Sequence, residues 1–136
     1  MIDLEWHDFL TIGVDFIDDD HKKILNIMQQ VIVAINENNL NESASLLEIL
    51  IKEAKEHFKR EEEYLLETKY PQLENHKIYH NELIIKAEMT KAICEGIETE
   101  HDIKECFESM ANFLIDDILR GDISFKSYLE HEGYIK

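Results

Sequence analysis

The sequence predicts an all-α fold, an up-down-up-down four-helix bundle with an extended N-terminal arm and a short C-terminal helix. Only one proline and four glycines occur among the 136 residues, so long helices can continue unbroken. Four segments carry apolar residues at helical spacing, and none shows the sustained alternation of a strand. Since short connections make successive helices antiparallel, one domain over residues 1–136 is the simplest arrangement.

Three parts are expected within this domain. Residues 1–16 form the arm, which mixes aromatic, polar and apolar side chains without helical periodicity. Residues 17–122 form the four-helix bundle. Residues 123–136 form a C-terminal segment that contains a short helix around residues 124–131.

The first two helices have recognisable start and stop signals. Asp18 can cap a first helix whose apolar positions extend from Ile24 to Ile35. The segment NENNLN ends that helix, and within it Asn41 can cap the second. The second helix stops before Pro71, because proline is tolerated at a helix start but not in its interior.

The third and fourth helices are bounded in the same way. The third is expected over about residues 71–95, with Gly96 as its C-terminal breaker. Thr99 and Asp102 resemble a capping pair for the fourth helix, which ends near Gly121.

The charge balance excludes several classes of partner. Lys and Arg total 14 and Asp and Glu total 30, a formal net charge of −16, which repels nucleic acid. No apolar run is long enough to span a bilayer, so no membrane is expected. The N-terminus lacks the basic and apolar regions of a signal peptide, which indicates a cytoplasmic protein.

The two cysteines do not form a CxxC pair. In a reducing compartment, Cys94 and Cys106 are expected to be free thiols that behave as small apolar side chains. They flank the turn predicted before the fourth helix almost symmetrically, so a redox pair is the disfavoured alternative.

Two pairs of possible metal ligands are spaced by one helical turn. His76 and His80, in HKIYH, lie at i and i+4 and therefore share a helix face. His57 and Glu61, in HFKRE, have the same spacing. Either pair alone also fits an ordinary contact on a charged helix surface.

The topology of the predicted bundle collects a larger set. In an antiparallel bundle, the starts of the first and third helices and the ends of the second and fourth lie at one end. The candidate ligands there are His21, His57, Glu61, His76, His80, Asp117 and Asp122. Their apolar neighbours at helical spacing turn them toward the core, where unpaired charge is costly and metal coordination removes that cost. Two metal ions sharing bridging carboxylates would explain why so many ligands gather in one place.

These motifs resemble the hemerythrin family, in particular its single-domain bacterial members, over nearly the whole chain. The family's N-terminal tryptophan matches Trp6, and its first histidine motif matches GVDFIDDDH, which ends at His21. HFKREE matches the element that carries a histidine and a glutamate ligand, and YPQLENHKIYH matches the tyrosine–proline turn followed by HxxxH. FLIDDILRGD matches the last element only in part.

The resemblance implies a non-haem di-iron centre with an oxo or hydroxo bridge, at which dioxygen binds. The implied ligands are His21 and His57 on one iron, His76, His80 and a fifth histidine on the other, and Glu61 and Asp122 as bridges between them. The iron with two histidines leaves a position open for dioxygen.

The chain departs from the family pattern in FLIDDILRGD. Asp117 stands where the family has its fifth histidine, and Phe113 replaces a tryptophan. His101 lies near the start of the fourth helix and His131 beyond its end, so neither can substitute. Asp117 can coordinate iron directly, act through a water molecule, or turn aside and leave a vacancy. A third carboxylate would favour the ferric state, which weakens the case for a durable oxygen carrier.

The leading hypothesis is therefore a monomeric di-iron protein that binds dioxygen for storage, delivery or sensing, without being an enzyme. One alternative is a di-iron enzyme that consumes peroxide or a related oxidant, and another is a non-redox metal-binding or iron-buffering bundle. The remaining acidic residues, including Glu62, Glu63 and the aspartates just before His21, are expected to be solvated or to cap helices.

Overall fold

The computed structural model describes residues 11–121 and 123–135, without the side chains of residues 111 and 113–121. In this part of the chain there are five helices and no strands: α1 (Asp15–Asn36), α2 (Leu40–Glu67), α3 (Leu73–Glu95), α4 (Glu100–Gly121) and α5 (Ile123–His131). None of the described helices is long and apolar enough to cross a membrane.

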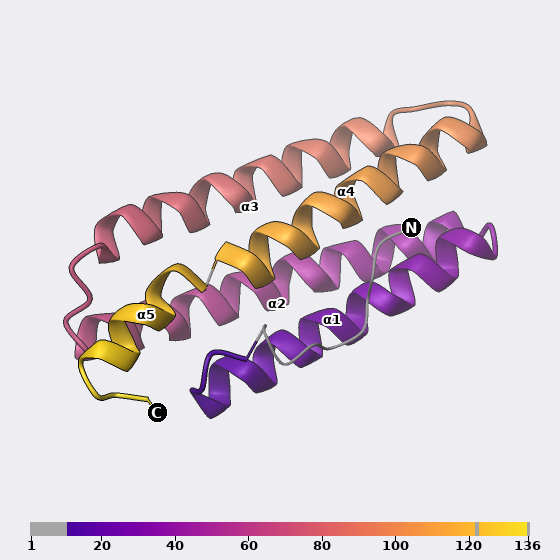
Figure 1. Cartoon of the computed structure of the whole chain (residues 1–136). Helices are drawn as coiled ribbons and strands as arrows, with labels where there is room; N and C mark the ends of the chain where they lie inside the picture. Colours follow the sequence, from indigo (N-terminus) through magenta and orange to yellow (C-terminus); the bar gives the residue numbers. More distant parts are fainter. Residues whose placement is uncertain (1–10, 122, 136) are drawn as a thin grey trace.

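The four long helices are arranged antiparallel (Figure 1). Helix α1 packs against α2 and α4, and α3 packs against the same two helices, which closes the bundle. The short helix α5 follows α4 and contacts it. The predicted all-α bundle with a short C-terminal helix is confirmed, whereas most of the predicted arm lies outside the described residues.

The capping role predicted for Asp18 is wrong. Helix α1 begins at Asp15, and the Asp18 carboxylate accepts hydrogen bonds from the backbone N–H groups of Ile12 (2.8 Å) and Gly13 (3.1 Å). Gly13 has φ +100°, a conformation that glycine adopts readily and that other residues rarely do. Asp18 therefore binds the preceding loop and is itself buried.

The cap predicted for the second helix is displaced by two residues. Asn39, not Asn41, is the N-cap of α2, and its side chain accepts from the backbone N–H of Glu42 at 3.3 Å. The cause is the C-terminus of α1, where Asn38 has φ +60° and Asn39 N–H donates to the carbonyl of Ala34 at 2.8 Å. These bonds form a Schellman motif, which fixes the direction in which α2 leaves the turn.

The end of α2 repeats this geometry. Lys69 has φ +59°, and Tyr70 N–H donates to the carbonyl of Leu65 at 2.9 Å. The turn contains Pro71, and α3 starts at Leu73, two residues later than predicted. The tightness of this turn keeps the last turns of α2 and the first turns of α3 side by side.

The other predicted helix signals are confirmed. Gly96 is the C-cap of α3, although its φ of −85° shows that it needs no left-handed conformation. The Thr99 hydroxyl donates to Asp102 at 2.6 Å immediately before α4, which ends at Gly121.

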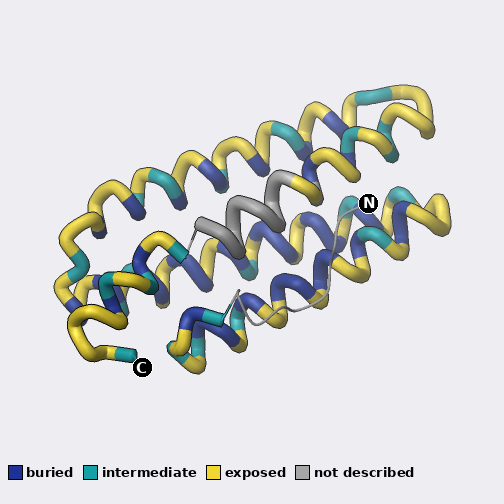
Figure 2. The backbone as a smooth tube through the Cα atoms, viewed as in Figure 1, coloured by how far each residue is buried: buried dark blue, intermediate teal, exposed yellow. Residues whose placement is uncertain are grey.

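Apolar residues fill the interior in two clusters. The larger lies between the four long helices and extends from Phe58 to the end of the bundle that carries Cys94. Figure 2 shows buried segments along the inner sides of these helices. The smaller lies where α5 packs and consists of Ile12, Ile17, Leu65, Leu73, Phe125 and Leu129. The Tyr128 hydroxyl of α5 donates to the carbonyls of Thr68 (2.6 Å) and Lys69 (3.0 Å). Helix α5 therefore holds the turn between α2 and α3.

The expectation of free thiols is wrong. Cys94 and Cys106 form a disulfide with an S–S distance of 2.04 Å and a Cα–Cα distance of 5.5 Å. The short turn between α3 and α4 brings the last turn of α3 level with the second turn of α4. Their Cα atoms therefore fall within the range of about 4.4–6.8 Å that a disulfide requires. This bond lies at the end of the bundle opposite to α5.

Candidate metal centre

Five of the seven predicted ligands come together at the end of the bundle where α1 and α3 begin and α2 ends. They are His21 on α1, His57 and Glu61 on α2, and His76 and His80 on α3. All five are buried, with exposed fractions of 6% or less. In the core such polar groups need strong partners, because burying an unpaired charge is costly.

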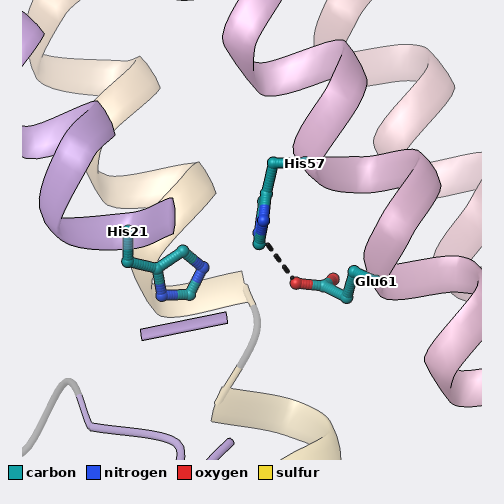
Figure 3. Close-up of side chains that lie close together, drawn as sticks. All are labelled: His21, His57 and Glu61. Atoms are coloured by element: carbon teal, nitrogen blue, oxygen red, sulfur yellow. Dashed lines mark ion pairs between the residues drawn. The ribbon is translucent and has the colours of Figure 1, made fainter. Parts of the chain in front are cut away.

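The five side chains form two groups that share one residue. His21, His57 and Glu61 make the first triad, and Glu61, His76 and His80 make the second; within each, one possible ligand atom per residue lies within 4.8 Å of the others. Figure 3 shows His21 of α1 facing His57 and Glu61 of α2, with the ion pair between the last two marked.

The two oxygens of Glu61 face different triads. Oε2 lies 2.9 Å from Nε2 of His57. Oε1 lies 2.9 Å from Nε2 of His76 and 3.1 Å from Nε2 of His80. A carboxylate directed to two sides in this way is positioned to bridge two cations.

Two further carboxylates hold the outer nitrogens of the imidazole rings. Asp20 Oδ2 lies 2.9 Å from Nδ1 of His57, and Glu62 Oε2 lies 2.8 Å from Nδ1 of His80. Asp20 and Glu62 were expected to be solvated or to act as caps, and this prediction is wrong for both. Such outer carboxylates fix the tautomer and orientation of metal-binding histidines and raise their basicity.

Asp20 is also held from the solvent side. The Arg60 guanidinium donates to Asp20 Oδ2 from Nε at 3.1 Å and from Nη2 at 2.9 Å. Burial alone would raise the pKa of Asp20, but the hydrogen bonds from His57 and Arg60 and the positive charge of Arg60 outweigh that effect and lower the pKa. Asp20 is therefore a stable anion behind the His57 ring.

The donor set fits a metal cation. A neutral imidazole carries one N–H, and in His57 and His80 its natural acceptor is the carboxylate at Nδ1. The Nε2 lone pairs then point at Glu61 oxygens 2.9 and 3.1 Å away, which is repulsive unless a cation or additional protons lie between them. Two ligands about 2.1 Å from one ion, at a right angle, are about 3.0 Å apart. The observed spacing agrees with that value.

Aromatic rings pack against the second triad. The Phe58 ring stacks on His80 with centroids 3.8 Å apart, and the edge of Phe125 meets His76 at 5.3 Å. Both phenylalanines are buried and restrict water around the imidazoles. Neither role could be recognised from the sequence, because the position of Phe58 directly after His57 is a weak signal and Phe125 lies in no ligand motif.

The remaining two predicted ligands lie outside what the structure describes. Residue 122 is not described, and of Asp117 only the helical backbone is. A separate cluster of His101, Asp102 and Glu105 is exposed at the start of α4. It resembles a surface ion pair, since His101 and Glu105 are 3.2 Å apart and one helical turn from each other.

An antiparallel four-helix bundle with two buried histidine–carboxylate triads at one end defines a helical metal-binding protein. The family model described as the hemerythrin HHE cation binding domain matches residues 12–121 of the chain. This match covers most of the chain, and the protein therefore belongs to the hemerythrin family, as its motifs predict.

Two curated relatives agree with this assignment. A bacteriohemerythrin of Clostridium acetobutylicum is 28% identical over 122 residues, covering 86% of this chain and 94% of the relative. A bacteriohemerythrin of Stenotrophomonas maltophilia is 28% identical over 119 residues, covering 88% of this chain and 76% of the relative. Family membership implies that the protein binds iron, and the two buried triads are groups that could hold a metal ion.

Proposed function

We propose that the protein binds dioxygen at a di-iron centre built on the two triads. The observation that carries this proposal is the position of Glu61, whose two oxygens face separate groups of histidines. His21 and His57 would hold one iron, and His76 and His80 would hold the other. Asp122 would supply a second bridge and Asp117 a further ligand to the second iron. When bound, the two irons supply the electrons for reversible binding of dioxygen.

The protein's own residues prepare the site for this chemistry. Asp20 and Glu62 keep the Nδ1 protons of His57 and His80 in place, so that both Nε2 atoms face the interior. Glu61 supplies negative charge where the cations would sit. The buried ring of Phe58 and the apolar cluster under α5 limit the access of water, which would protect reduced irons from oxidants in the solvent.

Dioxygen would bind at the first triad. In the family pattern the second iron has three nitrogen ligands and the first has two, so the first iron keeps an open position. In the family pattern, Asp117 stands at the position of the third nitrogen ligand of the second iron, so this departure would not involve the residues of the first triad.

A second candidate function is the consumption of peroxide or a related oxidant. The observation that favours it is Asp117, because an extra carboxylate stabilises the ferric state and shortens the life of an oxygenated one. Asp117→His should then slow autoxidation and lengthen the life of the oxygen adduct in stopped-flow measurements. If the original protein and this variant autoxidise at equal rates, Asp117 does not control the centre.

Metal analysis and absorption spectra test the proposal directly. Protein made with sufficient iron should contain two iron ions per chain, and anaerobically reduced samples should change their spectrum reversibly on exposure to dioxygen. His57→Ala and His80→Ala should each lower the iron content, whereas His101→Ala and His131→Ala should not. One iron ion or none in the loaded protein, or zinc in its place, would contradict the di-iron assignment.

A further inference from the structure

A pocket of about 350 Å³ lies between α2 and α3, directly outside the second triad. Three lysines line it, Lys55 and Lys59 from α2 and Lys77 from α3. The other charged residue among those lining it, Glu62, has an oxygen 2.8 Å from Nδ1 of His80, which also lines the pocket. We refer to these five residues as the lysine pocket.

The charge of the lysine pocket is opposite to that of the chain. The protein has a formal net charge of −16 and only 14 Lys and Arg residues, of which three meet here. Lys55 and Lys77 also form ion pairs with Glu88 and Glu74, at the half-exposed or exposed edge of the pocket. Because such surface pairs are weak, Lys55 and Lys77 can exchange Glu88 and Glu74 for the carboxylates of a partner that comes into contact.

The lysine pocket is connected to the second triad by two close contacts. Glu62, with 24% of its side chain exposed, binds Nδ1 of His80, and Nε2 of His80 lies 3.1 Å from Glu61. The His80 ring is otherwise enclosed by the stacked ring of Phe58. These contacts form a short path from the solvent to a proposed iron ligand.

An apolar strip on α3 borders the lysine pocket. Ile78, Ile85 and Met89 are spaced by seven and four residues, so they share one face, and they are 56%, 48% and 61% exposed. Between the first and the last, the helix rises by about 16 Å. Apolar contacts beside a charged rim are typical of protein interfaces, and electron-transfer partners bury areas at the low end of the range for specific interfaces.

We propose that the lysine pocket and the apolar strip together bind an acidic one-electron donor protein, which reduces the centre after it has oxidised. This inference rests on the proposed di-iron function. In each encounter the donor loses one electron and one ferric ion becomes ferrous, so two encounters restore both irons. The proton that the bridging oxygen requires comes from the solvent. A small anion would use the lysines alone, whereas the adjacent strip provides contact area for a protein.

The salt dependence of the reduction rate tests this proposal, because the net charge of the whole protein and the lysines of the pocket predict opposite results. An acidic flavodoxin in its hydroquinone state serves as the donor, and stopped-flow absorption follows reduction of the air-oxidised, iron-loaded protein. Repulsion by the net charge of −16 would make the rate rise with salt. Docking at the lysine pocket should instead make the rate fall by about tenfold between low and high salt.

Charge variants locate the effect. The triple variant Lys55→Gln, Lys59→Gln, Lys77→Gln should lose the fall with salt and react about tenfold more slowly at low salt. The matched triple variant Lys23→Gln, Lys104→Gln, Lys126→Gln removes the same charge elsewhere and should keep the original salt dependence. A small cationic ruthenium ammine reductant does not need the lysine pocket, so it should reduce the two triple variants at equal rates. Equal behaviour of the two triple variants toward flavodoxin would overturn the proposal.

A binding measurement separates this inference from the di-iron assignment. Isotope-labelled protein titrated with oxidised flavodoxin should show amide shift changes on α2 and α3 around the lysine pocket, whether or not the metal analysis finds two irons. Ile85→Glu should weaken this binding about tenfold. Loss of binding in inorganic phosphate, with no effect of Ile85→Glu, would mean that the lysine pocket takes a small anion and would refute docking.

Discussion

Removing the carboxylate of Glu62 should weaken iron binding at the second triad without touching a proposed ligand. The carboxylate accepts a hydrogen bond from Nδ1 of His80 at 2.8 Å. A hydrogen bond to a charged group contributes about 1.5–3 kcal/mol, and a neutral acceptor provides about half of that. Glu62→Gln should therefore lower iron affinity by about 3- to 10-fold, and Glu62→Ala by about 10- to 100-fold.

Competition against a chelator of known affinity measures this effect, with retained iron followed by absorption. Glu63 provides the matched control, since it is the next residue, carries the same charge and is exposed. Glu63→Gln and Glu63→Ala should retain iron as the original protein does. If Glu62→Ala and Glu63→Ala release iron at the same chelator concentration, the hydrogen bond to His80 does not support metal binding and the reasoning is refuted.

Three further predictions concern stability. The double variant Cys94→Ala, Cys106→Ala should lower the free energy of unfolding by about 3 kcal/mol, because the disulfide joins residues 12 positions apart. In denaturant unfolding, a reductant should lower the free energy of unfolding of the original protein by the same amount and should have no effect on the variant. Lys69→Gly should raise the free energy of unfolding by about 0.5–1 kcal/mol, because a φ of +59° strains lysine more than glycine. A lower midpoint of thermal unfolding would contradict this prediction. Lys91 is buried, which would lower its pKa, but hydrogen bonds to Glu95 and Glu48 raise the pKa above the ordinary 10.5. Its stabilisation is therefore complete below about pH 10.5 and is lost as the pH rises through the raised pKa, so urea unfolding of the original protein and Lys91→Met should differ at pH 8 and converge at high pH.

The bundle and the buried ligands could be predicted because each leaves a regular trace in the sequence. Helical spacing of apolar residues locates the long helices. A polar residue at one of these buried positions needs an interaction partner, and it therefore indicates a site. His57 and Glu61 show this, since one turn separates them on the buried face of α2. Antiparallel topology then places them level with His76 and His80 without any knowledge of side-chain geometry.

The outer carboxylates could not be predicted in this way. Asp20 and Glu62 each stand in a run of three acidic residues, and spacing does not tell which one faces an imidazole ring. That choice depends on the rotation of His57 and His80, which only the packed structure fixes. The disulfide was missed for a related reason, because the meeting of Cys94 and Cys106 depends on how far α4 is shifted along α3.

Glu61 has a consequence for how the centre fills with metal. It is the one residue common to both triads, and it is fully buried. The first cation to bind either oxygen fixes the rotamer of this carboxylate. The second cation then binds without the entropy cost of ordering the side chain. Loading should therefore be positively cooperative, and a sample given half the iron it needs should contain mainly empty and doubly loaded chains. In the proposed di-iron centre, a single side chain would thus couple the two binding events.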